Sequence, residues 1–201
     1  MAMGAIPIRE GGVFIQRERM NMPTMKILLA ASVLTTVFLY ACSSSDTEPP
    51  KPTVDLLTAI DKEDVTLVQQ HLKAGTDLNN YPIPEGLPLA GAQPLHLAVV
   101  KGNIEIVRLL LANGVDINLR AKNKDKAPAL SWAVVFLQKK MVSLLIESGA
   151  DINIVDANGA TAVDAANYIK VLSLKDEKTL LIIDEILKIL IKNGGLSVTE
   201  L

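Results

Sequence analysis

The apolar positions of residues 53–195 recur with the spacing of α-helices, and short polar breaks separate these helices into pairs. The clearest pair lies in residues 93–114, which read QPLHLAVVKGNIEIVRLLLANG. Its first helix is predicted to begin at Pro94, because the missing N–H of a proline has no partner in the first turn of a helix. Gly102 and Asn103 are expected to end this helix, and Gly114 is expected to end the second one in the left-handed cap conformation.

The same two phrases occur in three copies along the chain. The phrase at the end of each pair reads LKAGTDLN, LANGVDIN and IESGADIN, beginning at residues 72, 111 and 146, and a fainter copy, IKNG, begins at residue 191. About twenty residues before the first three stand LLTA, LHLA and LSWA. Internal repetition at this period predicts a solenoid of stacked helical hairpins.

The phrase QPLHLA at residues 93–98 resembles the T-P-L-H-x-A signature of the ankyrin repeat family. The resemblance covers residues 53–194 and implies an all-α ankyrin-repeat solenoid of about four helix-turn-helix repeats, joined by loops and β-turns. The domain is expected at 53–201, with repeats at about 53–79, 80–118, 119–153 and 154–195. The helices are expected to approach closely at four small residues, Ala59, Ala98, Ala133 and Ala166.

Two repeats depart from the regular pattern. The loop before repeat two is longer than its counterparts and contains Pro82, Pro84 and Pro88. Repeat four carries additional residues between its two helical phrases, around 168–179, and its final helix is expected at 180–191. These insertions mark the places where this chain differs from a plain repeat array.

The N-terminus carries a different apolar segment. Residues 27–41 are uncharged and follow Lys26, and they are shorter than the roughly 20 residues of a spanning helix. They predict a secretory signal at 25–41, preceded by residues 1–24 as an over-extended or disordered N-terminus.

The phrase Leu39-Tyr40-Ala41-Cys42 resembles the lipobox of bacterial lipoproteins. This resemblance implies a lipid on Cys42, and the Ser- and Pro-rich residues 42–52 would then form a tether. Ser43 after the cysteine favours the outer membrane, with the domain facing the periplasm. The alternative is an uncleaved anchor in which Cys42 has no special role.

Composition excludes several classes of function. The chain has 20 Lys and Arg against 22 Asp and Glu, and this balance argues against general nucleic-acid binding. A single cysteine excludes an intrachain disulfide and a zinc site built from cysteines. Only 3% of residues are aromatic while 49% are hydrophobic, so the core is expected to be aliphatic.

No catalytic motif is evident, and we predict no cofactor, metal or small-molecule substrate. His96 is interpreted as structural, because the family resemblance implies a bond between neighbouring repeats at that position. The recurrent residues Asp77, Asp116 and Asp151 each belong to a turn, where aspartate commonly bonds its own backbone. We interpret them as turn residues rather than as calcium ligands.

The family resemblance implies protein binding through the loop fingers and the exposed ends of the first helices. In repeat two this surface includes Val100 and Lys101, and in repeat three it includes Val135 and Phe136. Phe136 stands where repeat two has Lys101, and an exposed aromatic residue there would be a candidate hot spot. The alternative is that the enlarged fourth repeat folds over it.

The finger of repeat three alternates basic residues: Arg120, Lys122, Lys124 and Lys126. In an extended segment these cations would lie on one side and attract an acidic partner. The alternative is an ordinary solvated loop.

The sequence therefore predicts a non-catalytic protein-binding module, lipid-anchored in the bacterial envelope. Small periplasmic ankyrin lipoproteins resemble some immunity proteins that neutralise delivered toxic effectors, and this is one expected role. The other is an accessory or scaffold protein for a periplasmic enzyme or a stress response. The neighbouring genes would distinguish the two roles.

Overall fold

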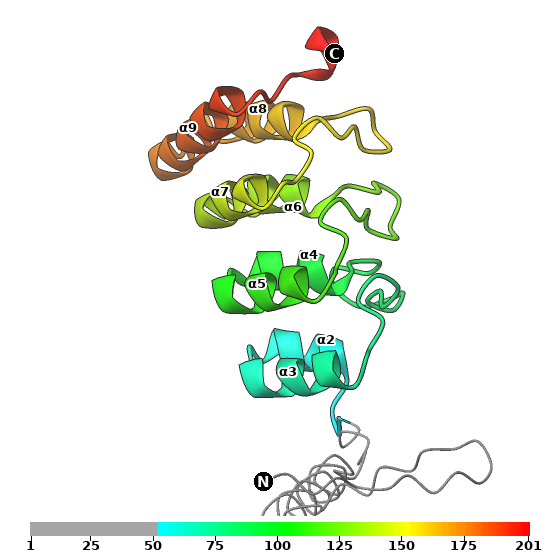
Figure 1. The fold of residues 1–201 in the computed structure, drawn as a ribbon. Helices are drawn as coiled ribbons and strands as arrows, with labels where there is room; N and C mark the ends of the chain where they lie inside the picture. Colours follow the sequence, from blue (N-terminus) through cyan, green and yellow to red (C-terminus); the bar gives the residue numbers. More distant parts are fainter. Residues whose placement is uncertain (1–51) are drawn as a thin grey trace, which may run out of the picture. The chain divides into compact units, whose positions relative to one another are not determined.

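The computed structural model describes residues 52–201, which form a stack of four helical hairpins (Figure 1). The hairpins are α2 (Leu56–Asp61) with α3 (Val65–Lys73), α4 (Pro94–Lys101) with α5 (Ile104–Ala112), α6 (Ala129–Val135) with α7 (Lys139–Glu147), and α8 (Ala162–Leu172) with α9 (Glu177–Lys192). A short 3-10 helix, Val198–Glu200, follows. The predicted all-α solenoid is confirmed for this part of the chain.

Each hairpin packs mainly on its neighbours. The first helices of the hairpins form one continuous row, in which α2 contacts α4, α4 contacts α6 and α6 contacts α8. The second helices pack as the pairs α3 with α5 and α7 with α9. Figure 1 shows the connecting loops projecting to the same side of the stack. The core is correspondingly a continuous aliphatic layer between successive hairpins.

The row of first helices is held together at small residues. Ala59, Ala98, Ala133 and Ala166 are all fully buried, as predicted for positions of close helix approach. A larger side chain there would push neighbouring hairpins apart. These four alanines mark equivalent positions in the four repeats.

The predicted helix ends in repeat two are confirmed. Pro94 is the first residue of α4, and Gly102 ends it with a φ of 75°. The Asn103 side chain then caps α5 by accepting a hydrogen bond from the Ile106 N–H at 3.0 Å. Gly114 has a φ of 84°, the left-handed conformation that glycine adopts at lowest cost.

The turn aspartates bond as predicted. The Asp77 carboxylate accepts the backbone N–H of Asn79 (2.9 Å), and the side-chain oxygen of Asn79 in turn accepts the Asp116 N–H (2.8 Å) of the next repeat. The same pair of bonds recurs from Asp116 through Asn118 to Asp151. It recurs once more from Asp151 through Asn153 to Leu196. We call this series the asparagine ladder.

The C-terminal segment completes the ladder on the last repeat. The Leu196 N–H donates to Asn153, and the Leu196 carbonyl accepts the Thr161 hydroxyl at 2.8 Å. The Val198 N–H donates to the Asp164 carboxylate at 2.9 Å. Residues 196–198 therefore satisfy polar groups that a following repeat would otherwise reach.

The additional residues of repeat four lengthen its helices instead of forming a separate insertion. Helix α8 has 11 residues and α9 has 16, against 7 in α6 and 9 in α7. Figure 1 shows this hairpin extending past the one before it, at the end away from the loops. The final helix begins at Glu177, earlier than the predicted residue 180, because Asp176 caps it by accepting bonds from the Thr179 N–H and hydroxyl.

The long loop before repeat two is closed on itself and on its neighbour. The Ile83 N–H donates to the Ala92 carbonyl (2.8 Å), and the Gly91 N–H donates back to the Ile83 carbonyl (2.9 Å). The Gly91 carbonyl accepts the Lys122 N–H of the next finger at 2.7 Å. The loop at residues 80–92 is therefore a fixed part of the stack.

The predicted signal at 25–41, the N-terminus at 1–24 and Cys42 lie outside the described residues, as does all but the last residue of the tether. Among the helices of residues 52–201, none combines the length and the apolar composition that crossing a membrane requires.

Candidate protein-binding surface

The exposed edge of the first helices changes in character along the stack. Two residues after the buried alanine of each repeat stand Asp61, Val100, Val135 and Tyr168, and three residues after it stand Lys62, Lys101, Phe136 and Ile169. This edge is charged in repeat one and largely apolar in repeats three and four. Because the alanines share one register, the side chains of each set occupy equivalent places on successive helices.

In repeats one and two the charged residues of this edge bind each other. The Lys101 Nζ lies 3.1 Å from the Asp61 carboxylate of the preceding repeat. Val100 is half-buried, and its carbonyl accepts the Gln138 side-chain N–H of the following repeat at 3.1 Å. Lys101 and Val100, both predicted to contact a partner, thus also join adjacent hairpins.

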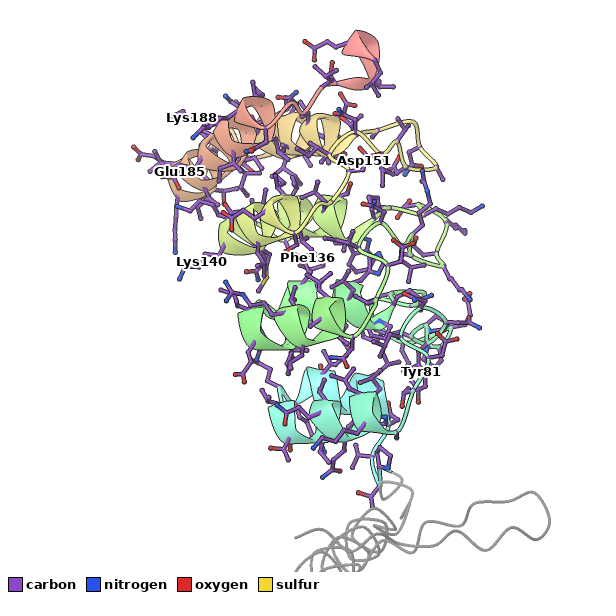
Figure 2. The ribbon with its side chains drawn as sticks, viewed as in Figure 1. Tyr81, Phe136, Lys140, Asp151, Glu185 and Lys188 are labelled. Atoms are coloured by element: carbon purple, nitrogen blue, oxygen red, sulfur yellow. The ribbon has the colours of Figure 1, made fainter. Side chains whose placement is uncertain are left out.

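Repeat three presents an uncovered apolar pair. Val135 is 47% exposed and Phe136 is 40% exposed. The lengthened fourth repeat does not fold over Phe136, so the alternative left open by the sequence does not hold. The Phe136 ring stacks on Trp132 at a centroid distance of 5.9 Å, and Trp132 meets His96 edge-on at 5.4 Å. Phe136 is thereby held in place on the third hairpin (Figure 2).

Three residues of α8 continue this apolar edge: Tyr168, Val171 and Leu172 are 65%, 64% and 65% exposed. Tyr168 is the equivalent of Val135, the last residue of α6, so Val171 and Leu172 lie beyond the end of α6. We call the five residues Val135, Phe136, Tyr168, Val171 and Leu172 the apolar inner patch. Exposed large apolar side chains gathered on adjacent helices are typical of a protein interface.

The basic finger bends instead of running extended. Residues 122–125 form bends, and the Ala121 N–H donates to the Ala127 carbonyl at 3.1 Å, which closes the loop. The four cations Arg120, Lys122, Lys124 and Lys126 are all exposed. They form none of the salt bridges found in residues 52–201. Their charge is therefore available to an acidic surface, although they are not aligned on one side of a strand.

Two of these cations also hold the finger in place. The Lys122 Nζ donates to the Asn80 side chain of the preceding loop, and the Arg120 guanidinium donates to the Lys126 carbonyl at 3.1 Å. On the other side, the Asn158 side chain donates to the Asp125 carboxylate at 3.1 Å. Bonds to both neighbouring loops keep the finger at a fixed position.

His96 serves the fold, as predicted. Its Nε2 donates to the Ala127 carbonyl of repeat three at 3.1 Å, and its Nδ1 accepts the Gln93 N–H at 3.3 Å. Burial lowers the pKa of His96 to about 4, although the bond to Ala127 acts in the opposite direction. A neutral, fully buried imidazole with both nitrogens engaged joins two repeats.

His71 has a comparable role at the start of the stack. Its ring nitrogens lie 3.1 Å from the Thr76 hydroxyl and 2.6 Å from the Val54 carbonyl. In residues 52–201, no group of three His, Cys, Asp or Glu residues is placed to hold a metal ion.

Comparison with known proteins agrees with this architecture. A family model for ankyrin repeats, in three copies, matches residues 56–156. The chain is 46% identical over 68 residues to the 2-5A-dependent ribonuclease of Homo sapiens and 43% identical over 68 residues to that of Mus musculus. These segments cover 34% of this chain but only 8% and 9% of those proteins. The chain belongs to the ankyrin repeat family.

Proposed function

We propose that this chain is a non-catalytic module that binds another protein through the apolar inner patch and the basic finger. Ankyrin repeats are protein-interaction modules, and the family match supports this general role. The observation that carries the proposal is the uncovered apolar patch on two adjacent helices, α6 and α8. An aromatic residue in such a patch contributes strongly to binding when a partner excludes water from it.

The exposed cations of the finger indicate which groups the surface of the partner should carry. They favour an acidic protein surface, because unpaired cations speed encounter and select the orientation of a partner of opposite charge. The partner we propose thus presents an apolar contact for the patch and carboxylates for the finger.

We further propose that the module acts in the bacterial envelope, held by a lipid on Cys42, and that its partner is a delivered toxic effector. The support for this is the resemblance of residues 39–42 to a lipobox and the small size of the repeat domain. The ribonuclease activity in the name of the relatives is not transferred, since the shared segment is a small fraction of those proteins.

Capture of the partner tests the binding surface. The full chain, solubilised from membranes and immobilised, is compared with Phe136→Ala and Lys124→Glu in recovering proteins from envelope extracts. We expect Phe136→Ala to lower recovery of the specific partner about tenfold or more. We expect Lys124→Glu to lower recovery of the partner at low salt, and we expect a smaller reduction at high salt.

Lys192→Glu is the matched control, because Lys192 is an exposed cation on α9, away from the finger. Equal recovery by all variants would refute the assignment of the surface. The identity of the captured protein decides the role: a toxin supports immunity, and a resident periplasmic enzyme supports the accessory role.

The lipid anchor has its own test. Cells that express the full chain are labelled with a palmitate analogue, and we expect the label on the wild type and its complete loss in Cys42→Ala, because the thiol is the only attachment point that the lipobox resemblance implies. Ser43→Ala should keep the label. An unlabelled wild type, or a labelled Cys42→Ala variant, would contradict the anchor and leave the binding surface unaffected.

A further inference from the structure

A groove of about 800 Å³ lies at the loop side of the first two repeats. One wall is α2 and the other is the loop at residues 80–92, with Leu97 of α4 contributing to the lining. The aliphatic residues that line it are Leu57, Ile83, Leu87, Leu89 and Leu97. Figure 2 shows Tyr81, another lining residue, between the first and second hairpins. The groove is separate from the apolar inner patch, which belongs to repeats three and four.

The loop wall is preorganised. Three prolines restrict its backbone, and the paired bonds between Ile83 and the residues Gly91 and Ala92 close it. The bond from the Lys122 N–H to the Gly91 carbonyl fixes it to the next finger. A wall that is ordered before binding loses little conformational entropy when a ligand arrives.

The rim of the groove exposes an apolar side chain. Leu87, near the tip of the loop, is 56% exposed and lines the groove. An aliphatic side chain at the mouth of an apolar groove gains further burial only if a ligand covers it. This arrangement favours an occupant that passes over the rim rather than one enclosed at the bottom.

The charged residues that line the groove are both acidic, Asp55 and Asp61. Asp61 is bound to Lys101. Asp55 accepts bonds from the Thr58 N–H and hydroxyl, and the hydroxyl bond foremost lowers the pKa of its carboxyl group. In the described part of the chain no cation lies within ion-pair distance of Asp55. Each carboxylate oxygen keeps lone pairs for a further donor.

We propose that this groove binds an extended segment of the protein partner that carries apolar side chains next to a lysine or arginine. The apolar side chains lie against the leucines, and the cation reaches Asp55. The inference rests on the proposed function, because it assumes a protein partner, and it names the chemistry of one segment of that partner.

The probe is a random peptide library displayed on phage and selected against the immobilised full chain. Enriched peptides are synthesised with a fluorescent label, and their dissociation constants are measured by anisotropy. We expect the enriched peptides to share two or more apolar residues next to a lysine or arginine. We expect Leu87→Ser and Asp55→Asn each to weaken their binding about tenfold.

The chain offers close controls for both substitutions. Asparagine caps helices as well as aspartate does, so Asp55→Asn removes the charge and keeps the cap of α2. Asp176 caps α9 with the same pair of bonds, from the Thr179 N–H and hydroxyl, so Asp176→Asn repeats the chemistry far along the chain. Leu201→Ser removes an exposed leucine elsewhere. Both controls should bind the peptides like the wild type.

The outcomes separate this inference from the proposed function. Peptides without a cation, or peptides that bind Leu87→Ser and Asp55→Asn as tightly as the wild type, would overturn the groove assignment. Failure to enrich any peptide would also overturn it. Phe136→Ala should leave peptide binding unchanged while it lowers capture of the partner. A failure of the inner-patch assignment and a failure of the groove assignment therefore give different results.

Discussion

Lowering the pH from about 7 to about 4.5 is expected to reduce the free energy of unfolding by about 2 to 3 kcal/mol through His96 alone. The folded protein holds this imidazole neutral, with a pKa of about 4, because it is buried. The unfolded chain binds a proton near the ordinary pKa of 6.5. The contribution of His96 is therefore fully present above pH 6.5 and is lost as the pH falls towards 4.

Trp132 provides the measurement, because it is the only tryptophan of the chain and its ring meets that of His96. Denaturation curves followed by its fluorescence at several pH values give the free energy of unfolding. The control is His96→Gln, which keeps a hydrogen-bond donor and an acceptor but does not titrate. The acidic groups are common to both proteins, so the difference between their pH profiles isolates His96. Parallel profiles would show that this histidine is not held neutral.

Gly91→Ala is expected to destabilise the fold by about 3 kcal/mol. A Cβ at this position would lie 2.5 Å from the Lys122 carbonyl carbon and 2.6 Å from the Asn123 nitrogen. Both are backbone atoms, so the loop and the finger must separate to relieve the contact. Separation breaks the bond from the Lys122 N–H to the Gly91 carbonyl. The left-handed φ of 79° adds conformational strain to the substitution.

Gly86→Ala is the matched control for this position. Gly86 lies in the same loop with a φ of 85°, but nothing approaches its Cβ position within 4 Å. Only the conformational cost remains, so we expect about 1 kcal/mol. Denaturation of both variants, together with hydrogen exchange of the Lys122 amide, checks the expectation. If both variants lost the same free energy of unfolding, Gly91 would not be in close contact with the backbone of the finger.

The repeat pattern was sufficient to predict the helical hairpins because their determinants are local. Pro94, Gly102 and Gly114 each act within one turn of their own position and take the predicted role, and Asn103, predicted with Gly102 to end α4, also caps α5. The prediction that His96 bonds to the next repeat rested on the family resemblance and not on the spacing of residues. The early start of α9 had a local signal as well, since Asp176 and Thr179 form a helix cap that the apolar pattern did not include.

The apolar inner patch could not be predicted in the same way. Tyr168, Val171 and Leu172 have the spacing of a buried helix face, and periodicity does not distinguish a face that meets a neighbour from one that meets solvent. The difference depends on the length of α6, which ends at Val135 and leaves the last turn of α8 without a facing helix. The exposure of Phe136 likewise depends on what the neighbouring repeats place beside it, which the local pattern does not encode.

The asparagine ladder has a consequence for how such a chain can change its size. Asn79, Asn118 and Asn153 make the same joint with the segment that follows, whether it is a whole repeat or the short segment that begins at Leu196. A unit duplicated or deleted between two joints would leave the remaining bonds of the ladder chemically unchanged. The number of repeats could therefore change in whole units, because residues 196–198 would make the same bonds to any repeat that carries the equivalent asparagine, threonine and aspartate.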